Sequence, residues 1–160
     1  MESMPEIEDA VIKAIGDVLS DRQATLAVAE SLTGGELSAR FACAEGSSEW
    51  YRGGVVAYAS EVKHALLDVP DGPVVSEVAV TAMVEHVADM LGADIAVSVT
   101  GVAGPAPQDD QPPGTVWLAV RVGGRTHTRL EHFAGDPPDI VEATMRCAAT
   151  WLLELLTDAS

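Results

Sequence analysis

One junction between a strand and a helix constrains the fold of this chain most strongly. The apolar run of residues 25–29 predicts a strand, and residues 36–44 predict a helix. Between them, residues 30–35 read Glu-Ser-Leu-Thr-Gly-Gly, which places two hydroxyls and two glycines at the start of the helix. A glycine inside a helical turn costs roughly 1 kcal/mol relative to alanine, so this composition needs a reason.

Two interpretations fit this junction about equally well on the residues alone. In the first, the glycines let a ligand approach the backbone, and free N–H groups at the helix start bind an anion such as phosphate. In the second, Ser31 or Thr33 caps the helix, and the glycines relieve crowding against a neighbouring strand. Both interpretations stay open at this point.

Length and composition limit the class of protein. A chain of 160 residues, 48% of them hydrophobic, predicts one globular domain whose core needs neither disulfides nor metals. No apolar run approaches the ~20 residues that cross a bilayer. The acidic N-terminus lacks the basic region of a signal peptide, so we expect a cytoplasmic protein. We also expect Cys43 and Cys147 to be buried free thiols.

The charge is strongly negative, with 25 acidic and 9 basic residues and a net charge of −16. Such a surface repels nucleic acid and anionic membranes, so we expect direct binding to neither. Abundant carboxylates and scarce lysine suggest an acidic, halophilic protein whose self-repulsion is screened by salt; an ordinary acidic cytoplasmic protein is the alternative. Because Lys13 and Lys63 are the only lysines, the retention of Lys63 suggests a function for it.

The rest of the chain alternates between helical and extended patterns. Apolar residues at helical spacing predict helices over residues 6–20, 61–67, 77–91 and 138–156. Apolar, β-rich runs predict strands over residues 53–59, 95–100, 114–122 and 125–133. Gly123-Gly124 joins the last two strands as a tight antiparallel hairpin.

A hairpin that follows α/β units predicts a three-layer α/β/α sandwich with a mixed β-sheet. We expect a single domain over residues 1–160, with an N-terminal helix at 6–20 and a core at 24–156. Residues 101–105, a small-residue loop, end a buried strand, and ligands gather at such strand ends in open α/β sheets. His127 and His132 are five residues apart on one strand, hence on opposite faces, which argues against a shared metal.

Lys63 lies in the first turn of the predicted helix 61–67. The helix dipole disfavours a cation there, but its ~0.3–1 kcal/mol lowers the pKa by less than one unit. Burial or a second positive neighbour would have to supply the rest before Lys63 is a neutral base at pH 7. A solvated lysine on a short surface helix is the alternative.

Several short motifs follow one another from residue 26 to the closing helix. They are Ala29-Glu30-Ser31-x-Thr33-Gly34-Gly35, Gly46-Ser47-Ser48, Gly53-Gly54-Val55-Val56-x-Tyr58-x-x-x-x-Lys63, Val75-Ser76-Glu77, Val99-Thr100-Gly101-Val102-Ala103-Gly104-Pro105 and Gly114-Thr115-Val116. This series resembles the C-terminal domain of the CinA (competence/damage-inducible) proteins, also called the PncC family. Members of this kind hydrolyse the carboxamide of nicotinamide mononucleotide to nicotinic acid mononucleotide and ammonia. Longer members carry a further N-terminal domain, whose activity we expect to be absent here.

The resemblance implies roles for individual residues. Ser31 matches the proposed nucleophile, and Tyr58 and Lys63 match its partners. A desolvated lysine can activate a serine, with a tyrosine hydroxyl relaying or orienting the proton. The implied substrate-binding positions are Thr33, Gly34, Gly35, Gly46, Ser47, Ser48, Thr100, Gly101 and Thr115. Backbone N–H groups of residues 33–35 would hold either the oxyanion or the nucleotide phosphate. For Thr100 and Thr115, a hydroxyl that closes a strand end is an equal alternative.

The resemblance thus implies a metal-independent amidohydrolase without a cofactor, which acts on a pyridine mononucleotide in NAD metabolism. It also implies a dimer or higher oligomer, for which Trp50 and Tyr51, taken as an exposed aromatic pair, are a candidate contact. Two alternatives remain. One is an amidohydrolase of the same mechanism on another small amide, and the other is a non-catalytic interaction protein associated with competence or recombination.

This chain departs from the family pattern at several places. Leu32 stands where the family usually has cysteine, and residues 106–111, Ala-Pro-Gln-Asp-Asp-Gln, replace a glycine-rich segment with a lysine. Pro137 and, approximately, Val141 replace arginines, which would be natural bidentate partners for a phosphate or carboxylate. Their loss puts the nucleotide substrate in question. The arginines that could substitute for them are Arg52, Arg121, Arg125, Arg129 and Arg146.

Overall fold

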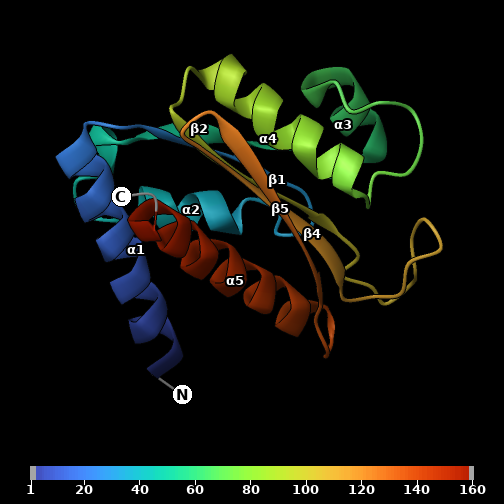
Figure 1. Ribbon diagram of the computed structural model, residues 1–160. Helices are drawn as coiled ribbons and strands as arrows, with labels where there is room; N and C mark the ends of the chain where they lie inside the picture. Colours follow the sequence, from blue (N-terminus) through green and yellow to red (C-terminus); the bar gives the residue numbers. More distant parts are fainter. Residues whose placement is uncertain (1–2, 159–160) are drawn as a thin grey trace.

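A five-stranded mixed sheet forms the middle layer of the protein (Figure 1). The structure is a computed structural model, which describes residues 3–158. Its elements are α1 (Ser3–Arg22), β1 (Leu26–Glu30), α2 (Glu36–Ala42), the 3₁₀ helix η1 (Ser47–Glu49), β2 (Tyr51–Val56), α3 (Ser60–Leu67), α4 (Glu77–Leu91), β3 (Ile95–Gly101), β4 (Thr115–Val122), β5 (Arg125–His132) and α5 (Pro137–Asp158). The strand order is β2-β1-β3-β4-β5; β1 runs parallel to β2 and β3, and β4 runs antiparallel to both of its neighbours, β3 and β5. The predicted α/β/α sandwich with a mixed sheet is confirmed.

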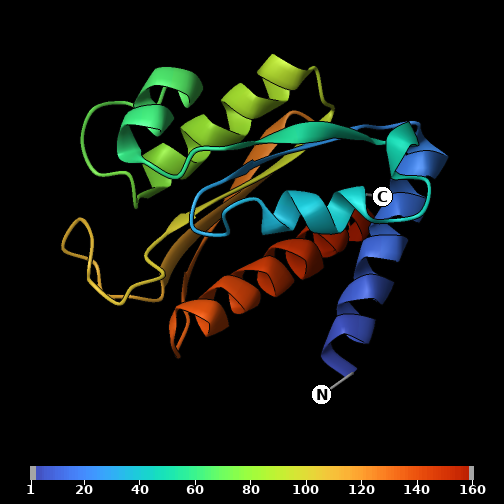
Figure 2. The same cartoon turned by 180° about the vertical axis from the view of Figure 1, so that it is seen from behind.

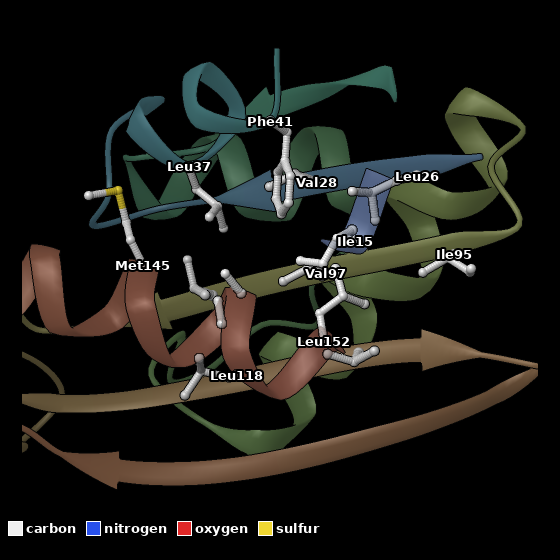
Figure 3. Packing of buried hydrophobic residues seen from close by; sticks show 14 of the residues in the cluster. Ile15, Leu26, Val28, Leu37, Phe41, Ile95, Val97, Leu118, Met145 and Leu152 are labelled. Atoms are coloured by element: carbon white, nitrogen blue, oxygen red, sulfur yellow. The ribbon is translucent and has the colours of Figure 1, made fainter. Parts of the chain in front are cut away.

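Helices cover both faces of the sheet, with α1, α2 and α5 on one face and α3 and α4 on the other (Figures 1 and 2). The larger hydrophobic cluster lies under α1, α2 and α5 and includes Leu26 and Val28 of β1. Figure 3 shows these side chains with Val97 of β3, Ile15 of α1 and Leu152 of α5. Because side chains alternate along a strand, the neighbours of Leu26 and Val28 point to the opposite face.

That opposite face is made of small side chains, which let α4 lie close to the sheet. The strand residues in this second cluster are Ala27, Ala29, Ala96 and Ala119. The stripe of α4 packs on them with Val80, Met83, Val84 and Val87, all fully buried. Ser76 caps α4, since its hydroxyl accepts from the N–H of Ala79 at 3.1 Å. Both the stripe and the cap follow the sequence prediction.

Several expectations for the surface are wrong. Trp50 is 2% exposed because it packs edge-on against Phe41 and beneath Gly16, where an added Cβ would lie 3.1 Å from Trp50 Nε1. Trp50 is therefore not available as an oligomer contact. Cys43 is exposed and Cys147 is half-buried, so the thiols are free, as expected, but not both buried. Burial raises the pKa of the Cys147 thiol.

Element boundaries differ from the sequence prediction by a few residues. Strand β2 begins at Tyr51 rather than at residue 53, because Tyr51 already pairs with Leu26 of β1. Helix α2 ends at Ala42, two residues before the predicted end. Within residues 3–158, no helix is both long and apolar enough to cross a membrane.

Candidate active site

The candidate site starts at the carboxyl end of β1, where Glu30 is fully buried. Its carboxylate reaches forward to the start of α2. Oε1 accepts from the N–H groups of Gly35 at 3.2 Å and Leu37 at 3.0 Å, and Oε2 accepts from Ser38 N–H at 2.7 Å. The Thr33 hydroxyl donates to the same carboxylate. Glu30 thus caps α2 from the preceding strand, with its negative charge at the positive end of the helix.

This contact argues against both interpretations of the junction. Neither Ser31 nor Thr33 caps the helix: the N-cap residue is Gly35, which has no side chain for that purpose. The N–H groups of Gly35, Leu37 and Ser38 are also not free for a phosphate, since Glu30 occupies them. Sequence reasoning missed Glu30 as the cap. The signal was an acidic residue ending an otherwise apolar strand, directly before the helix.

The two glycines are explained by the turn that they form. Gly34 and Gly35 have φ angles of +60° and +104°, which favour glycine because a Cβ is strained there. The turn is closed by hydrogen bonds from Gly34 N–H to Ser31 O and from Glu36 N–H to Thr33 O, both 3.0 Å long. It reverses the chain directly after the strand. Ser31, 3% exposed, is thereby held at the carboxyl edge of the sheet.

A cavity of about 270 Å³ lies at this edge. Ser31 and Leu32 form one wall, Tyr58 follows β2, and residues from two parts of the β3–β4 loop complete the lining. These residues are Gly101, which ends β3, and Val102, Ala103, Gly104, Ala106, Pro107 and Gln108 of the loop itself. Ligands gather at the carboxyl ends of parallel strands, and β1, β2 and β3 all end here. The structure therefore brings Ser31, Tyr58 and Gly101 together.

A larger cavity of about 450 Å³ lies elsewhere, between α1 and the C-terminal part of α2. It is lined by Trp50 together with charged side chains such as Lys13 and Arg40. We place the site in the smaller cavity, because it combines a buried serine at a strand end with a tyrosine and a nearby buried lysine, whereas Lys13, Ser20 and Cys43 of the larger cavity are all exposed.

Lys63 lies in α3 and is 2% exposed. Its Nζ donates to the backbone oxygen of Tyr58 at 3.3 Å, which joins it to the segment that lines the cavity. Burial lowers the pKa of Lys63 from 10.5 to about 8, while the negative charge of Asp109 acts in the opposite direction. The alternative of a solvated surface lysine is wrong. Burial supplies the shift that the helix dipole alone does not.

The threonines predicted to bind substrate have partners inside the protein. The Thr100 hydroxyl donates to Val74 O at 2.7 Å, and the Thr115 hydroxyl donates to Pro112 O at 2.9 Å. Both residues are buried, so these contacts favour the alternative in which each hydroxyl closes a strand end. Gly101 is required for space: a Cβ there would lie 2.7 Å from the backbone oxygen of Thr115.

Gly46, Ser47 and Ser48 do not lie at this cavity. They precede β2, whose first residue pairs with Leu26 at the beginning of β1 rather than with Glu30 at its end. The Ser47 hydroxyl donates to Ala42 O at 2.8 Å. Within one chain, the length of the sheet separates these residues from Ser31, so their assignment to the same ligand site is corrected.

No arginine lines the cavity among the residues that the structure describes. Arg52 donates to Leu91 O, and Arg121 lies 3.7 Å from Glu85. Arg129 pairs with Glu131 and stacks on Trp151, while Arg146 lies 3.8 Å from Glu142. Arg125 is exposed at the start of β5, beside the hairpin turn. None of the five candidates replaces the arginines that the resemblance leads one to expect.

A metal ion would need a cluster of His, Cys, Asp or Glu ligands. Across the described part of the chain, no group of three or more His, Cys, Asp and Glu side chains is arranged to hold one. His127 and His132 both lie on β5, with the odd spacing that places them on opposite faces of the strand.

The fold and the cavity define a small α/β domain whose candidate site lies at the carboxyl edge of a mixed sheet. The chain belongs to the CinA C-terminal domain family, whose model matches residues 8–156. CinA-like proteins of Frankia casuarinae and Salinibacter ruber are 42% and 40% identical to it, over 83% and 80% of this chain. The chain spans only about a third of the length of these relatives, 32% and 33%. The resemblance inferred from the motifs is confirmed.

Relatives of similar length and solved structures agree with this assignment. Protein YdeJ of Escherichia coli (strain K12) is 32% identical over 94% of this chain and 93% of its own length. The crystal structure of the competence damage-inducible protein A from Klebsiella pneumoniae is 35% identical, with a TM-score of 0.90 over 94% of this chain and 97% of that one. The competence/damage inducible protein CihA from Agrobacterium tumefaciens is 26% identical, with a TM-score of 0.87 over 92% and 94%.

Proposed function

We propose that the protein is an amidohydrolase that converts nicotinamide mononucleotide and water to nicotinic acid mononucleotide and ammonia, without a metal ion. The observation that carries the proposal is the buried Lys63, whose lowered pKa of about 8 leaves roughly one molecule in ten with a neutral amine at pH 7. It is hydrogen-bonded to the backbone of Tyr58, and the side chain of Tyr58 shares a cavity with Ser31.

The reaction has two steps on this constellation. Ser31 Oγ attacks the carboxamide carbon while the neutral Lys63 amine takes the hydroxyl proton, directly or through the Tyr58 hydroxyl. The tetrahedral intermediate expels ammonia, which leaves with the proton that Lys63 returns, and an ester forms on Ser31. Water then attacks the ester carbon and gives its proton to Lys63, and the Ser31 oxygen leaves and is reprotonated. The products are the carboxylic acid and free enzyme.

The developing oxyanion needs hydrogen-bond donors in this cavity. The N–H groups of Gly35, Leu37 and Ser38 are excluded, because Glu30 holds all three. Donors to the oxyanion and to the phosphate therefore belong to other groups around the cavity. The N–H groups of Ala103 and Gly104 are our candidates, since both residues line the cavity with Ser31, whereas the N–H of Val102 donates to Thr115 O at 2.9 Å.

The test is ammonia release from nicotinamide mononucleotide by the purified protein, measured at low and at multimolar salt. The Ser31→Ala variant should lose ammonia release, and the matched Ser47→Ala variant, which removes a hydroxyl at the other end of the sheet, should retain it. A folded wild-type protein that releases no ammonia under either condition would refute the mononucleotide assignment.

A second candidate function is favoured by one observation, the lack of arginine in the cavity lining. It is the same two-step hydrolysis on a small amide that carries no phosphate. A panel of nucleotide and non-nucleotide amides separates the two candidates: the highest kcat/KM on an uncharged amide, lost in Ser31→Ala, would favour the second. Ammonia release from none of them, together with capture of a recombination protein, would instead favour a non-catalytic role.

A further inference from the structure

The β3–β4 loop carries an unusual turn at its tip. Gln108 and Gln111 pair through two backbone hydrogen bonds of 3.1 and 2.8 Å. The two residues between them, Asp109 and Asp110, have φ angles of +52° and +61°. Residues other than glycine adopt this left-handed region at a cost, so two of them in succession require a compensating contact.

Asp109 makes that contact. Its Oδ2 accepts from the N–H groups of Val74 at 2.9 Å and Val75 at 3.1 Å, in the segment between α3 and α4. Val74 is also held from the other side, because its carbonyl accepts from the Thr100 hydroxyl at 2.7 Å at the end of β3. Val74 and Val75 are 2% and 3% exposed, so the carboxylate attaches the loop tip to a rigid part of the protein.

The attached loop is also a wall of the cavity. Ala106, Pro107 and Gln108, which lead directly into the tip, line the cavity together with Ser31 and Leu32. Releasing the tip would therefore free one side of the cavity. Positioning errors of about 1 Å are enough to lower the rate of an enzyme substantially.

Asp109 also acts on Lys63 through its charge, which favours the protonated amine against the effect of burial. The other titratable groups around α3 are Glu61 and His64 on the helix itself and Tyr58 before it. At its C-terminal end, Asp68 pairs with His86 of α4 at 3.2 Å. Among the residues that the structure describes, Asp109 is the charged group that shifts the proton equilibrium of Lys63.

We propose that Asp109 is a positioning residue of the candidate amidase site, which attaches the β3–β4 loop to Val74 and Val75 and stabilises the cation that forms when Lys63 accepts a proton. The proposal rests on the proposed function for its kinetic consequences. One carboxylate thereby couples the shape of the cavity to the base that activates Ser31.

Two substitutions separate the two roles. Asp109→Asn keeps an oxygen that accepts from Val74 and Val75 but removes the charge, whereas Asp109→Ala removes both. Asp110→Asn is the matched control, because it removes an equal charge from the same turn at a residue that makes neither contact. Asparagine tolerates positive φ at least as well as aspartate, so both Asn variants should fold.

For Asp109→Asn we expect the rising limb of kcat/KM against pH to move to lower pH, with KM nearly unchanged. For Asp109→Ala we expect the same movement and, in addition, a loss of about tenfold or more in kcat/KM. Asp110→Asn should show neither change. An Asp109→Asn variant whose pH profile coincides with that of the wild type would refute the proposal, as would a loss of activity in both Asp109 variants without any movement of the limb.

A second measurement keeps the proposal testable if the substrate is different. The chain has only two lysines, so selective ¹³C,¹⁵N labelling of lysine gives two side-chain signals, with Lys13 as the internal reference. The Lys63 signal should titrate at lower pH in Asp109→Asn than in the wild type or Asp110→Asn. A shifted titration without ammonia release would support the positioning role and refute the mononucleotide assignment; an unshifted titration would refute the positioning role itself.

Discussion

Replacing Lys63 with methionine should stabilise the folded protein at neutral pH while abolishing activity. The folded state lowers the pKa of Lys63 from 10.5 to about 8, so it disfavours the cation that the unfolded chain carries freely. This gap corresponds to about 3 kcal/mol at pH 7. Methionine fills a similar volume without a charge, and it forgoes only the hydrogen bond to Tyr58 O, worth about 1 kcal/mol. We therefore expect a net stabilisation of ~2 kcal/mol.

The pH dependence of this stabilisation shows whether the lowered pKa of Lys63 is its cause. Between pH 8 and 10.5 the unfolded state binds more protons than the folded state, so the stability contributed by Lys63 rises with pH. The penalty is fully present below pH 8 and disappears above 10.5. The advantage of Lys63→Met should therefore be largest at pH 7 and should vanish, or change sign by the lost hydrogen bond, at pH 10.5.

Urea denaturation at pH 7 and pH 10.5, in moderate salt, measures both free energies of unfolding. Lys13→Met is the matched control: Lys13 is exposed and pairs with Asp17 at 3.2 Å, so its loss should cost ~0.3–0.5 kcal/mol at pH 7. A Lys63→Met protein that is less stable than the wild type by the same amount at both pH values would refute the burial argument, and with it the case for Lys63 as a base.

Three further changes test other parts of the structure. Glu30→Gln should destabilise the protein by ~2–3 kcal/mol, because a neutral amide replaces the carboxylate that three N–H groups and the Thr33 hydroxyl share; urea denaturation beside Glu36→Gln measures it. Gly101→Ala should cost ~1–3 kcal/mol and reduce activity, since its Cβ would lie 2.7 Å from Thr115 O; an unchanged Tm would contradict this. Salt screens the self-repulsion of a chain with a net charge of −16, so the melting temperature of the protein should rise by several degrees from 0.1 to 2 M KCl. A melting temperature that does not change with salt would argue against the halophilic interpretation.

The sequence predicts the layers of this fold because the patterns that indicate helices, strands and turns lie within short segments of the chain. The apolar run of residues 25–29, the stripe of α4 and the Gly123-Gly124 hairpin each depend on residues close together in the chain. The burial of Trp50 depends instead on Gly16, which lies far away in sequence. Patterns of hydrophobicity do not contain that contact, so they predict an exposed aromatic pair beside a loop.

The candidate site is likewise predictable only where it depends on residues close together in the chain. The motifs point to Ser31, Tyr58 and Lys63; in the structure Ser31 and Tyr58 line one cavity, and the buried Lys63 donates to the backbone oxygen of Tyr58. The motifs do not predict the side chains elsewhere in the chain that interact with these residues and set their chemistry. Glu30 reaches past the junction to α2, and Asp109 acts on Lys63 from a distant loop. Motif order along the chain also does not say at which end of a strand a motif lies, which is why Gly46–Ser48 was misplaced.

Two carboxylates therefore determine what this site can bind. Glu30 occupies the start of α2, so the helix end that ordinarily binds an anion is already neutralised by the protein itself. Asp109 attaches the loop that follows residues 106–108 of the cavity lining to the N–H groups of Val74 and Val75. With no arginine in the described lining, we expect an anionic substrate to be recognised through backbone N–H groups. We expect specificity to depend on residues 106–108, which line the cavity and belong to the segment that departs from the family pattern, rather than on the Ser31 motif that follows it.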